Sequence, residues 1–402
     1  LLAHALQMKW KIRQMDVPTA FLNGDLDIDV YIKPPKGVDV KDGTILKLNK
    51  ALYGLRESPR KWNECFDSFM HEHGLKRSQY DFCLYHGSNV WVLIWVDDIL
   101  ITGENCGKMV KLLKNRFHAK DLGELRDFLG TEIISCGDSL KISQKRFIEK
   151  VLTKFKMLEC KTADTPMEAG FQVDGTSKQV QVPFREIVGS LMYISTISRP
   201  DVAFATSFFS RYLDRPTEQL WKGAKRILRY LKTTIDLSLT YDYDTTPTLA
   251  LVGFSDSDWA GDHSDRKSVS GSLVMFHGNA ISWSSRKQSS VALSTAEAEY
   301  IACAGTATDL LHAKGVAYEL CDRTVVPVLQ CDNQSAIKLV SSYQNSKRAK
   351  HIAIKFHFIK DVVAKKEMRI DFVKSQDNLA DILTKPLGHV KFETLRKMIK
   401  VV

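Results

Sequence analysis

Apolar and polar positions along the chain follow two different periods, which predicts successive strands and amphipathic helices. The apolar run at 90–96 is typical of a buried strand, and helix-period apolar positions at 61–73 predict an amphipathic helix. No internal repeat is evident, and Pro and Gly separate the segments. We therefore expect residues 1–135 to form a mixed α/β layer.

The pattern changes after residue 135, where helix-period apolar positions dominate as far as residue 246. Helices are predicted at 144–155, 185–196, 201–212 and 217–232. Pro200 and Pro216 stand near the starts of the last two, a position at which proline is favoured. The polar stretch 168–182, rich in Gly, Ser and Gln, predicts a loop or linker. The region 136–246 is thus expected to be mostly helical.

The last region, 247–402, mixes both periods. Its predicted order is three strands, a helix, a strand, two helices, a strand and a final helix. This order is typical of an α+β domain with helices packed on a mixed sheet. Because 402 residues exceed what one hydrophobic core usually supports, we predict three domains, at 1–135, 136–246 and 247–402.

The composition indicates that the protein binds a polyanionic partner, and it excludes several classes of protein. The net charge is +10, and basic residues concentrate at 141–161 and 341–402, although solvated helix faces also produce such clusters. The eight cysteines form no C-x-x-C pair, which favours a reducing, intracellular setting. No apolar run approaches the roughly 20 residues of a membrane span. The chain opens with Leu1-Leu2 and no Met, so we expect a fragment of a longer protein.

Acidic residues interrupt apolar segments at two places in the first region. Asp16 lies in a strand-like apolar run, where an unpaired buried carboxylate is costly. Asp97 and Asp98 divide the apolar segment 94–101, which predicts a hairpin whose turn presents both carboxylates. A plain surface turn is the alternative. Because adjacent like charges repel, the apolar flanks favour a site for a hard divalent cation such as Mg²⁺, the kind of ion that promotes phosphoryl transfer.

A second group of acids lies at element junctions in the last region. Apolar strands are predicted to end at Asp256 and at Asp332, and carboxylates at strand ends converge readily. Asp381 opens a further helical stretch. Any one of these residues could be a simple cap or turn residue, but several acids at such junctions favour a common site.

A fourth acid in this region is indicated by a helix-start motif. The sequence Ser294-Thr-Ala-Glu297 is a capping box, so Glu297 should reach back to the start of its helix. Glu299 is then left to face the sheet and to meet Asp256.

Three stretches of the first region resemble the reverse transcriptase of copia-type long-terminal-repeat retrotransposons. They are Gln14 to Gly24, Leu52-Tyr-Gly-Leu-Arg-Glu-Ser-Pro-Arg-Lys-Trp62 and Trp95-Val-Asp-Asp98. The resemblance implies that Asp16, Asp97 and Asp98 hold two Mg²⁺ ions, with Mn²⁺ as the alternative, and align a primer 3′ hydroxyl with a deoxynucleotide triphosphate. It also implies an RNA template and a DNA primer as partners.

The same resemblance assigns residues to the nucleotide and to the primer and template. Phe21 falls where such polymerases place an aromatic ring that excludes a 2′ hydroxyl, with core packing as the alternative. The motif that lies against template and nucleotide contains Tyr53, Gly54, Ser58 and Pro59. Leu122 to Gly130 resembles the segment that grips the primer, which adds Gly130 to the expected site.

Two departures from the family pattern bear on polymerisation. Trp95 stands where the family usually has Tyr. Only 15 residues precede Asp16, where the family has a long fingers segment whose basic residues hold the triphosphate. We therefore expect DNA synthesis by this chain to be weak or absent.

From Leu249 to Leu387 the chain resembles the RNase H domain that follows reverse transcriptase in the same family. The resemblance implies two Mg²⁺ ions that cleave the RNA strand of an RNA–DNA hybrid. Their ligands would be Asp256, Glu299, Asp332 and Asp381. Ala353 stands where the family usually has Asp. His351 and His357 lie on different faces of a predicted helix, so we propose no zinc site there.

These features predict an α+β multidomain protein with an incomplete polymerase palm and thumb, a helical connection and an RNase H-like mixed sheet with flanking helices. The expected activity is Mg²⁺-dependent cleavage of RNA in RNA–DNA hybrids, in cytoplasmic particles or in the nucleus. A catalytically inactive relic that binds nucleic acid is the alternative. An enzyme of small phosphorylated substrates is disfavoured, because no G-x-x-x-x-G-K-[ST] pattern occurs. The oligomeric state is left open.

Overall fold

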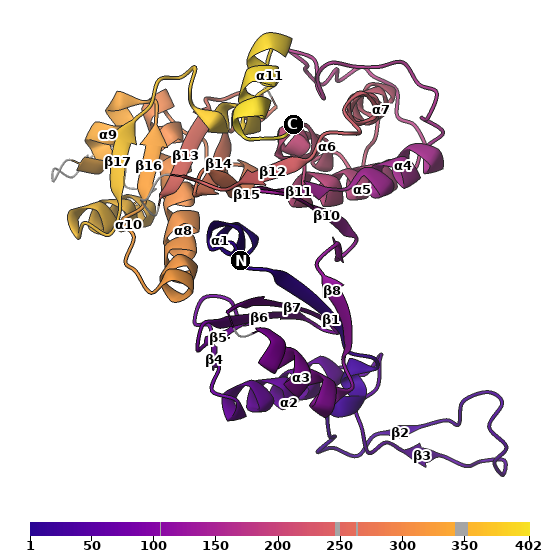
Figure 1. The fold of residues 1–402 in the computed structure, drawn as a ribbon. Helices are drawn as coiled ribbons and strands as arrows, with labels where there is room; N and C mark the ends of the chain where they lie inside the picture. Colours follow the sequence, from indigo (N-terminus) through magenta and orange to yellow (C-terminus); the bar gives the residue numbers. More distant parts are fainter. Residues whose placement is uncertain (105, 246–249, 263, 342–352) are drawn as a thin grey trace. The chain divides into compact units, whose positions relative to one another are not determined.

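The computed structural model describes residues 1–104, 106–245, 250–262, 264–341 and 353–402. The chain divides into two compact units, Leu1–Leu129 and Gly130–Val402 (Figure 1). The division into three domains at 1–135, 136–246 and 247–402 stays a prediction, and its second boundary lies outside the described residues.

The first unit is built on an antiparallel sheet in the order β4-β5-β6-β7-β1-β8 (Figure 1). Its strands are β1 (Ile12–Asp16), β4 (Lys76–Arg77), β5 (Leu84–Gly87), β6 (Val90–Trp95), β7 (Asp98–Gly103) and β8 (Lys120–Glu124). The unit also contains α1 (Leu2–Gln7), η1 (Ala20–Asn23), the paired strands β2 (Tyr31–Ile32) and β3 (Leu46–Lys47), α2 (Ser58–Glu72), α3 (Cys106–Phe117) and β9 (Asp127–Phe128). The predicted strand at 90–96 and helix at 61–73 are confirmed.

An aromatic cluster holds α2 and α3 under this sheet. Trp62, Phe66 and Phe69 follow the spacing i, i+4, i+7, which places them on one face of α2. Phe117 at the end of α3 contacts all three, with ring centroids 5.1, 5.9 and 4.9 Å apart. All four are buried in one core together with residues of β1, β6 and β7. The strands that carry the predicted acids are therefore fixed by apolar packing.

The second unit begins with a small sheet and a group of helices. Strands β10 (Thr131–Cys136), β11 (Ser139–Ser143) and β12 (Leu239–Asp242) pair antiparallel. The helical elements are α4 (Lys145–Lys154), α5 (Phe184–Ile197), η2 (Pro200–Val202), α6 (Ala203–Ser210) and α7 (Glu218–Thr233). The four predicted helices are confirmed, except that the third begins with the 3₁₀ turn η2. The predicted loop at 168–182 contains only turns and an isolated bridge at Gln179.

A buried ion pair ties these helices together. The Arg199 guanidinium donates hydrogen bonds to both carboxylate oxygens of Asp201, at 2.9 and 2.7 Å, and one more to the carbonyl of Thr234 at 3.0 Å. The Tyr230 hydroxyl donates to Asp201 at 2.6 Å. Because every charge in this group is paired, η2 is locked to the end of α7 despite complete burial of Arg199.

The main sheet of the second unit has the order β15-β14-β13-β16-β17 (Figure 1). Strands β13 (Leu251–Asp258), β14 (Val269–Phe276) and β15 (Asn279–Lys287) pair antiparallel, whereas β16 (Val328–Cys331) and β17 (Arg369–Phe372) are parallel to β13. The helices are α8 (Thr295–Cys321), α9 (Gln334–Ser341), α10 (Ala353–Ala364), η4 (Leu379–Leu383) and α11 (His389–Met398). The predicted element order and the α+β class with a mixed sheet are confirmed.

Two glycines allow helices to approach the main sheet closely on opposite faces. A Cβ on Gly253 of β13 would lie 2.7 Å from a methyl group of Leu310 in α8. A Cβ on Gly271 of β14 would lie 2.7 Å from the Thr384 methyl group and 2.8 Å from the Ala380 carbonyl oxygen of η4. Since side chains alternate along a strand and Asp256 is the register partner of Gly271, Asp256 stands on the η4 face. None of the helices in the described part of the chain has the length and apolar character of a membrane span.

Candidate active sites

The first candidate site lies where β1 meets the hairpin of β6 and β7. Asp16 and Asp98 are direct register partners in the antiparallel pair, so their side chains project from the same face of the sheet. Trp95 pairs with Asp98, which leaves Val96 and Asp97 as the hairpin turn. The expectation that the turn presents both Asp97 and Asp98 is therefore wrong for Asp98, which begins β7.

The turn that carries Asp97 has a strained backbone. Val96 has φ of 55°, a left-handed value that is rare for a β-branched residue. Two hydrogen bonds hold it there. The Trp62 indole N–H donates to the Val96 carbonyl at 2.6 Å, and the Val17 N–H donates to the Asp97 carbonyl at 2.8 Å. Trp62 thus links the buried aromatic cluster to the acidic turn.

The electrostatics of this site are those of crowded carboxylates. Partial burial, followed by the charges of Asp97 and Asp16, raises the pKa of Asp98 above its usual value. Burial and then the charge and hydrogen bond of Asp97 raise the pKa of Tyr53. Among the described residues, no Lys or Arg forms an ion pair with Asp16, Asp97 or Asp98. A cation would relieve this repulsion.

The other residues of the first unit that were predicted to act in polymerisation lie in the core, in a turn and at the start of α2. Phe21 is buried in the core, with its ring centroid 4.3 Å from that of the exposed Tyr53. Gly54 has φ of 97° in the turn that follows. Ser58 and Pro59 begin α2, and the Ser58 hydroxyl donates to the Leu52 carbonyl at 2.5 Å.

Gly130 is the first residue of the second unit, whereas the other residues predicted for polymerisation belong to the first unit. It has φ of 75°, and a Cβ there would lie 3.0 Å from the Tyr193 hydroxyl. Its predicted contact with a primer stays a prediction.

The second candidate site lies at the end of two neighbouring parallel strands in the main sheet. Ser255 of β13 and Cys331 of β16 are the last register partners of that parallel pair. Asp256 and Asp332 come next along the chain, so both carboxylates lie where the pairing of β13 with β16 ends. Strand β13 itself continues to Asp258 in its pairing with β14, so the prediction that this strand ends at Asp256 is wrong by two residues. Asp256 is buried, and Asp332 is partly exposed.

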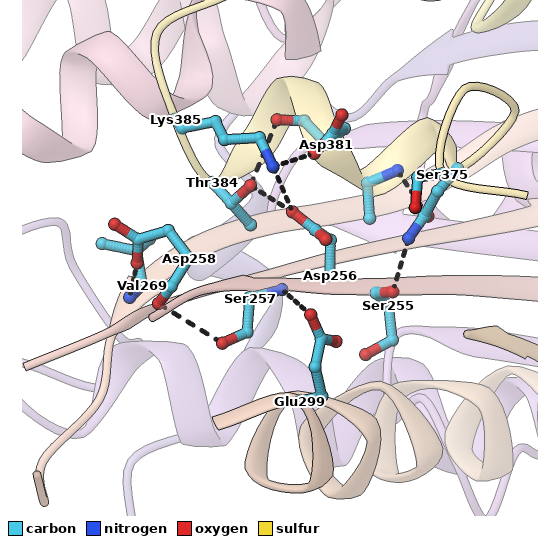
Figure 2. A network of polar contacts seen from close by, with 12 residues as sticks. Ser255, Asp256, Ser257, Asp258, Val269, Glu299, Ser375, Asp381, Thr384 and Lys385 are labelled. Atoms are coloured by element: carbon cyan, nitrogen blue, oxygen red, sulfur yellow. Dashed lines mark hydrogen bonds and ion pairs between the residues drawn. The ribbon is translucent and has the colours of Figure 1, made fainter. Parts of the chain in front are cut away.

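Helix α8 supplies the third carboxylate. The Ser294 hydroxyl oxygen accepts a hydrogen bond from the Glu297 N–H at 3.2 Å, and the Glu297 carboxylate accepts one from the Leu293 N–H at 3.0 Å. Glu297 therefore serves the helix start, as predicted. Glu299 faces the sheet instead, where its Oε1 accepts a hydrogen bond from the Ser257 N–H at 3.3 Å (Figure 2). Its Oε2 is buried and has no hydrogen-bond partner among the residues that the structure describes.

The short helix η4 supplies Asp381 and closes the site over the sheet. The Asn378 side chain accepts a hydrogen bond from the Ala380 N–H at 3.2 Å and donates one to the Ser255 carbonyl at 2.9 Å. At the other end of η4 the Thr384 hydroxyl donates to Asp256 (Figure 2). Asn378 and Thr384 were not among the residues singled out from the sequence. Their only sequence signal is that polar residues flank a short apolar element.

Two lysines also contact this site and were not predicted. The Lys385 Nζ lies 2.5 Å from Oδ1 of Asp381 and 3.8 Å from Oδ2 of Asp256 (Figure 2). The Lys391 ammonium, from α11, pairs with Oδ2 of Asp381. Asp381 is thus bound on both oxygens.

Burial and mutual repulsion set the pKa values of this site. Burial is the main cause that raises the pKa of Asp256 to about 7, and Asp381 and Asp332 add to it. Burial and then the charges of Asp256 and other neighbours raise the pKa of Glu299 to about 10. For Asp381, burial is outweighed by Lys385 and Lys391, which lower its pKa. Without a bound cation, burial favours the protonated form of Glu299.

The donor set fits a hard divalent cation. Oxygens of Glu299 and Asp332 and the Cys331 sulfur all lie within 4.8 Å of one another. A hydrogen bond with Cys303 and burial raise the pKa of the Cys331 thiol, so it stays protonated and is a poor ligand. This leaves oxygen donors, and the unpartnered Oε2 of Glu299 is one of them. His351 and the side chain of Ala353 lie outside the described residues.

Comparison with known families and curated proteins agrees with these features. Residues 1–169 match the family described as reverse transcriptase (RNA-dependent DNA polymerase). The chain is 37% identical over 420 residues to the retrovirus-related Pol polyprotein from transposon TNT 1-94 of Nicotiana tabacum, with 99% of this chain and 31% of that protein covered. It is 38% identical over 414 residues to the corresponding polyprotein from transposon RE1 of Arabidopsis thaliana, with 100% and 28% covered.

Among solved structures, the chain is similar to RNase H1 LC11, isolated from compost by a metagenomic approach. The identity is 16%, the TM-score is 0.28, and 34% of this chain and 94% of that chain are covered. A TM-score of this size is too low to support a fold assignment. The fold of this unit is assigned from its strand order. The chain spans less than a third of the length of the two polyproteins. By sequence, the chain belongs to the retrovirus-related Pol polyproteins of copia-type transposons, which are related to reverse transcriptases.

Proposed function

We propose that the second unit cleaves the RNA strand of RNA–DNA hybrids, using divalent cations held by Asp256, Glu299, Asp332 and Asp381. The observation that carries this proposal is the buried Oε2 of Glu299, which has no hydrogen-bond partner in the described part of the chain and lies among other carboxylates. A buried, unpartnered carboxylate oxygen is costly unless a cation completes its surroundings.

The chain's own residues would hold and orient the ions. Asp256 and Asp332 project from adjacent strand ends, and Glu299 approaches them from α8. The Thr384 hydroxyl and the Ser257 N–H each occupy one carboxylate oxygen, which fixes the rotamers of Asp256 and Glu299. Bound there, divalent cations such as Mg²⁺ would supply an activated water and stabilise the leaving 3′ oxygen.

This proposal is tested by incubating the chain with an end-labelled RNA–DNA hybrid, with Mg²⁺ or with EDTA. We expect cleavage of the RNA strand only with Mg²⁺, and a loss of at least about 100-fold in Asp256→Asn and Asp332→Asn. Glu297→Gln is the matched control, because Glu297 lies on the same helix as Glu299 but serves the cap, where Gln is also suitable. Intact RNA in every reaction, with tight binding of the hybrid, would favour the inactive relic instead.

We further propose that Asp16, Asp97 and Asp98 form the polymerase site that in the longer relatives would add deoxynucleotides to a primer. The support is the register of Asp16 with Asp98, the turn that presents Asp97, and the partial burial and then the repulsion that raise the pKa of Asp98. Primer extension on an RNA template with deoxynucleotide triphosphates tests it. Extension that survives Asp97→Asn would contradict this assignment.

A further inference from the structure

Lys385 lies where a cation would be expected in the second site. This inference rests on the function proposed above. The Lys385 Nζ is 2.5 Å from Oδ1 of Asp381 and 3.8 Å from Oδ2 of Asp256. It therefore bridges two of the four acids proposed as metal ligands, as Figure 2 shows.

The two lysines at this site differ in what they contact. The Lys391 ammonium pairs with the other oxygen of Asp381 and with the Ser375 carbonyl, which joins α11 to the loop before η4. No contact of Lys391 with Asp256 occurs among the described residues. Of these two lysines, Lys385 is the one that contacts both Asp256 of strand β13 and Asp381 of helix η4.

Lys385 is also able to leave this position. Its side chain is 42% exposed, whereas the side chains of Asp256 and Asp381 are 4% and 3% exposed. A flexible lysine stem can move its ammonium into water, but buried carboxylates on a strand and a short helix cannot follow. The carboxylates stay in place when the lysine moves away.

We propose that Lys385 is a displaceable counter-ion of the carboxylate cluster. In the metal-free protein its ammonium neutralises Asp256 and Asp381 and keeps η4 docked on the sheet. A divalent cation that binds these acids must displace the ammonium, so the lysine raises the cation concentration that the site requires. The ammonium and the divalent cation compete for the same carboxylate oxygens and cannot bind them together. The lysine therefore shifts the equilibrium toward the form without a bound cation.

The test uses the full chain without nucleic acid. Binding of Mg²⁺ and of Mn²⁺ is measured by isothermal titration calorimetry, and thermal unfolding is recorded in EDTA and at increasing Mg²⁺. For Lys385→Met we expect a lower Tm than wild type in EDTA and about tenfold tighter binding of the cation, because the competing charge is gone. Lys385→Gln provides a second variant with a polar side chain and the same expected directions.

Lys397→Met is the matched control. Lys397 lies on α11 and pairs with Glu393 at the surface, with a 60% exposed side chain. Its removal should leave both the Tm in EDTA and the affinity for Mg²⁺ unchanged. An unchanged or weaker affinity for Mg²⁺ in both Lys385 variants, or an unchanged Tm in EDTA, would overturn the inference.

These outcomes are separate from the test of the nuclease. A shift in cation affinity without any RNA cleavage would support the counter-ion and refute the proposed activity. Cleavage by wild type with no shift in Lys385→Met would do the reverse.

Discussion

The Glu299 side chain is buried, accepts a hydrogen bond on only one of its two carboxylate oxygens among the described residues, and has a strongly raised pKa. Its folded-state pKa of about 10 lies above the ordinary value of 4.5, so the metal-free folded protein binds more protons than the unfolded chain between these two values. Stability in EDTA should therefore fall as pH rises through that interval. A bound cation should remove this pH dependence, because it stabilises the ionised form.

Replacement of Glu299 by Gln tests this directly. Gln keeps the shape but cannot ionise, so we expect Glu299→Gln to be more stable than wild type in EDTA at pH 9, by on the order of 1–2 kcal/mol, with a smaller gain at pH 6. Urea unfolding at both pH values measures it. The Glu297→Gln control should show no such pH-dependent gain. A variant less stable than wild type at pH 9 would contradict the buried, metal-free state described for Glu299.

Val96 offers a second test at the residue scale. Its φ of 55° suits glycine better than a residue with a Cβ, so Val96→Gly should be more stable than Val96→Ala by about 0.5–1 kcal/mol. Both variants lose the packing of the Val96 side chain against the core, so the difference between them isolates the backbone strain. The midpoint of urea unfolding followed by tryptophan fluorescence gives the comparison. Equal effects of Gly and Ala would show that Val96 stores no strain.

At the scale of elements, η4 packs closely on β14 because Gly271 has no Cβ. Gly271→Ala would place a Cβ against the Thr384 methyl group and the Ala380 carbonyl, and should cost about 1–3 kcal/mol. Because η4 carries Asp381, we also expect a smaller rise in Tm on addition of Mg²⁺. Differential scanning calorimetry with EDTA and with Mg²⁺ reports both effects.

Gly305 is the matched control for this substitution. It lies on α8, and a Cβ there would meet no atom within 4 Å. Gly305→Ala should therefore stabilise the helix by about 0.5–1 kcal/mol and leave the response to Mg²⁺ intact. A Gly271→Ala protein that behaves like Gly305→Ala would contradict the close packing of η4.

Sequence patterns could predict the elements because their signals are local. The capping box at Ser294 placed the start of α8 correctly, and with it the direction of Glu299 toward the sheet. Apolar runs that end in acids also located Asp256 and Asp332. Each of these signals depends on neighbours within a few residues along the chain.

The parts that could not be predicted depend on register or on distant partners. Asp98 was expected in a turn, but the pairing of Trp95 with Asp98 starts β7 one residue earlier than expected. Thr384 and Lys385 meet Asp256 across 128 and 129 positions of sequence, and no periodicity encodes such contacts.

At the scale of the whole molecule, the net charge of +10 is partly gathered on α7. Lys222, Lys225 and Arg229 line a cavity of about 610 Å³ together with Phe171 and Phe209. Basic side chains beside aromatic rings are suited to binding a nucleic-acid strand. The phosphates can pair with the basic side chains, and the bases can contact the phenylalanine rings. We expect this face to contribute to binding of the proposed hybrid.

The triple variant Lys222→Ala, Lys225→Ala, Arg229→Ala should bind an RNA–DNA hybrid about tenfold more weakly and show a shallower dependence on salt. Fluorescence anisotropy in EDTA, at several KCl concentrations, measures affinity without cleavage. A triple variant with equal loss of charge, Lys33→Ala, Lys36→Ala, Lys41→Ala, is the control, because these residues are exposed near β2 and β3. Equal losses in both would show that binding reports net charge alone.

The position of η4 late in the second unit has a consequence for biosynthesis. Strands β13, β14 and β15 and helix α8 leave the ribosome well before η4, because Asp256 precedes Thr384 by 128 residues. Until η4 emerges and docks, a nascent chain displays Asp256 and Glu299 without Asp381 or Thr384. A translation product that stops before residue 378 would therefore lack Asp381 and Thr384, and with them the contacts that η4 makes with Asp256.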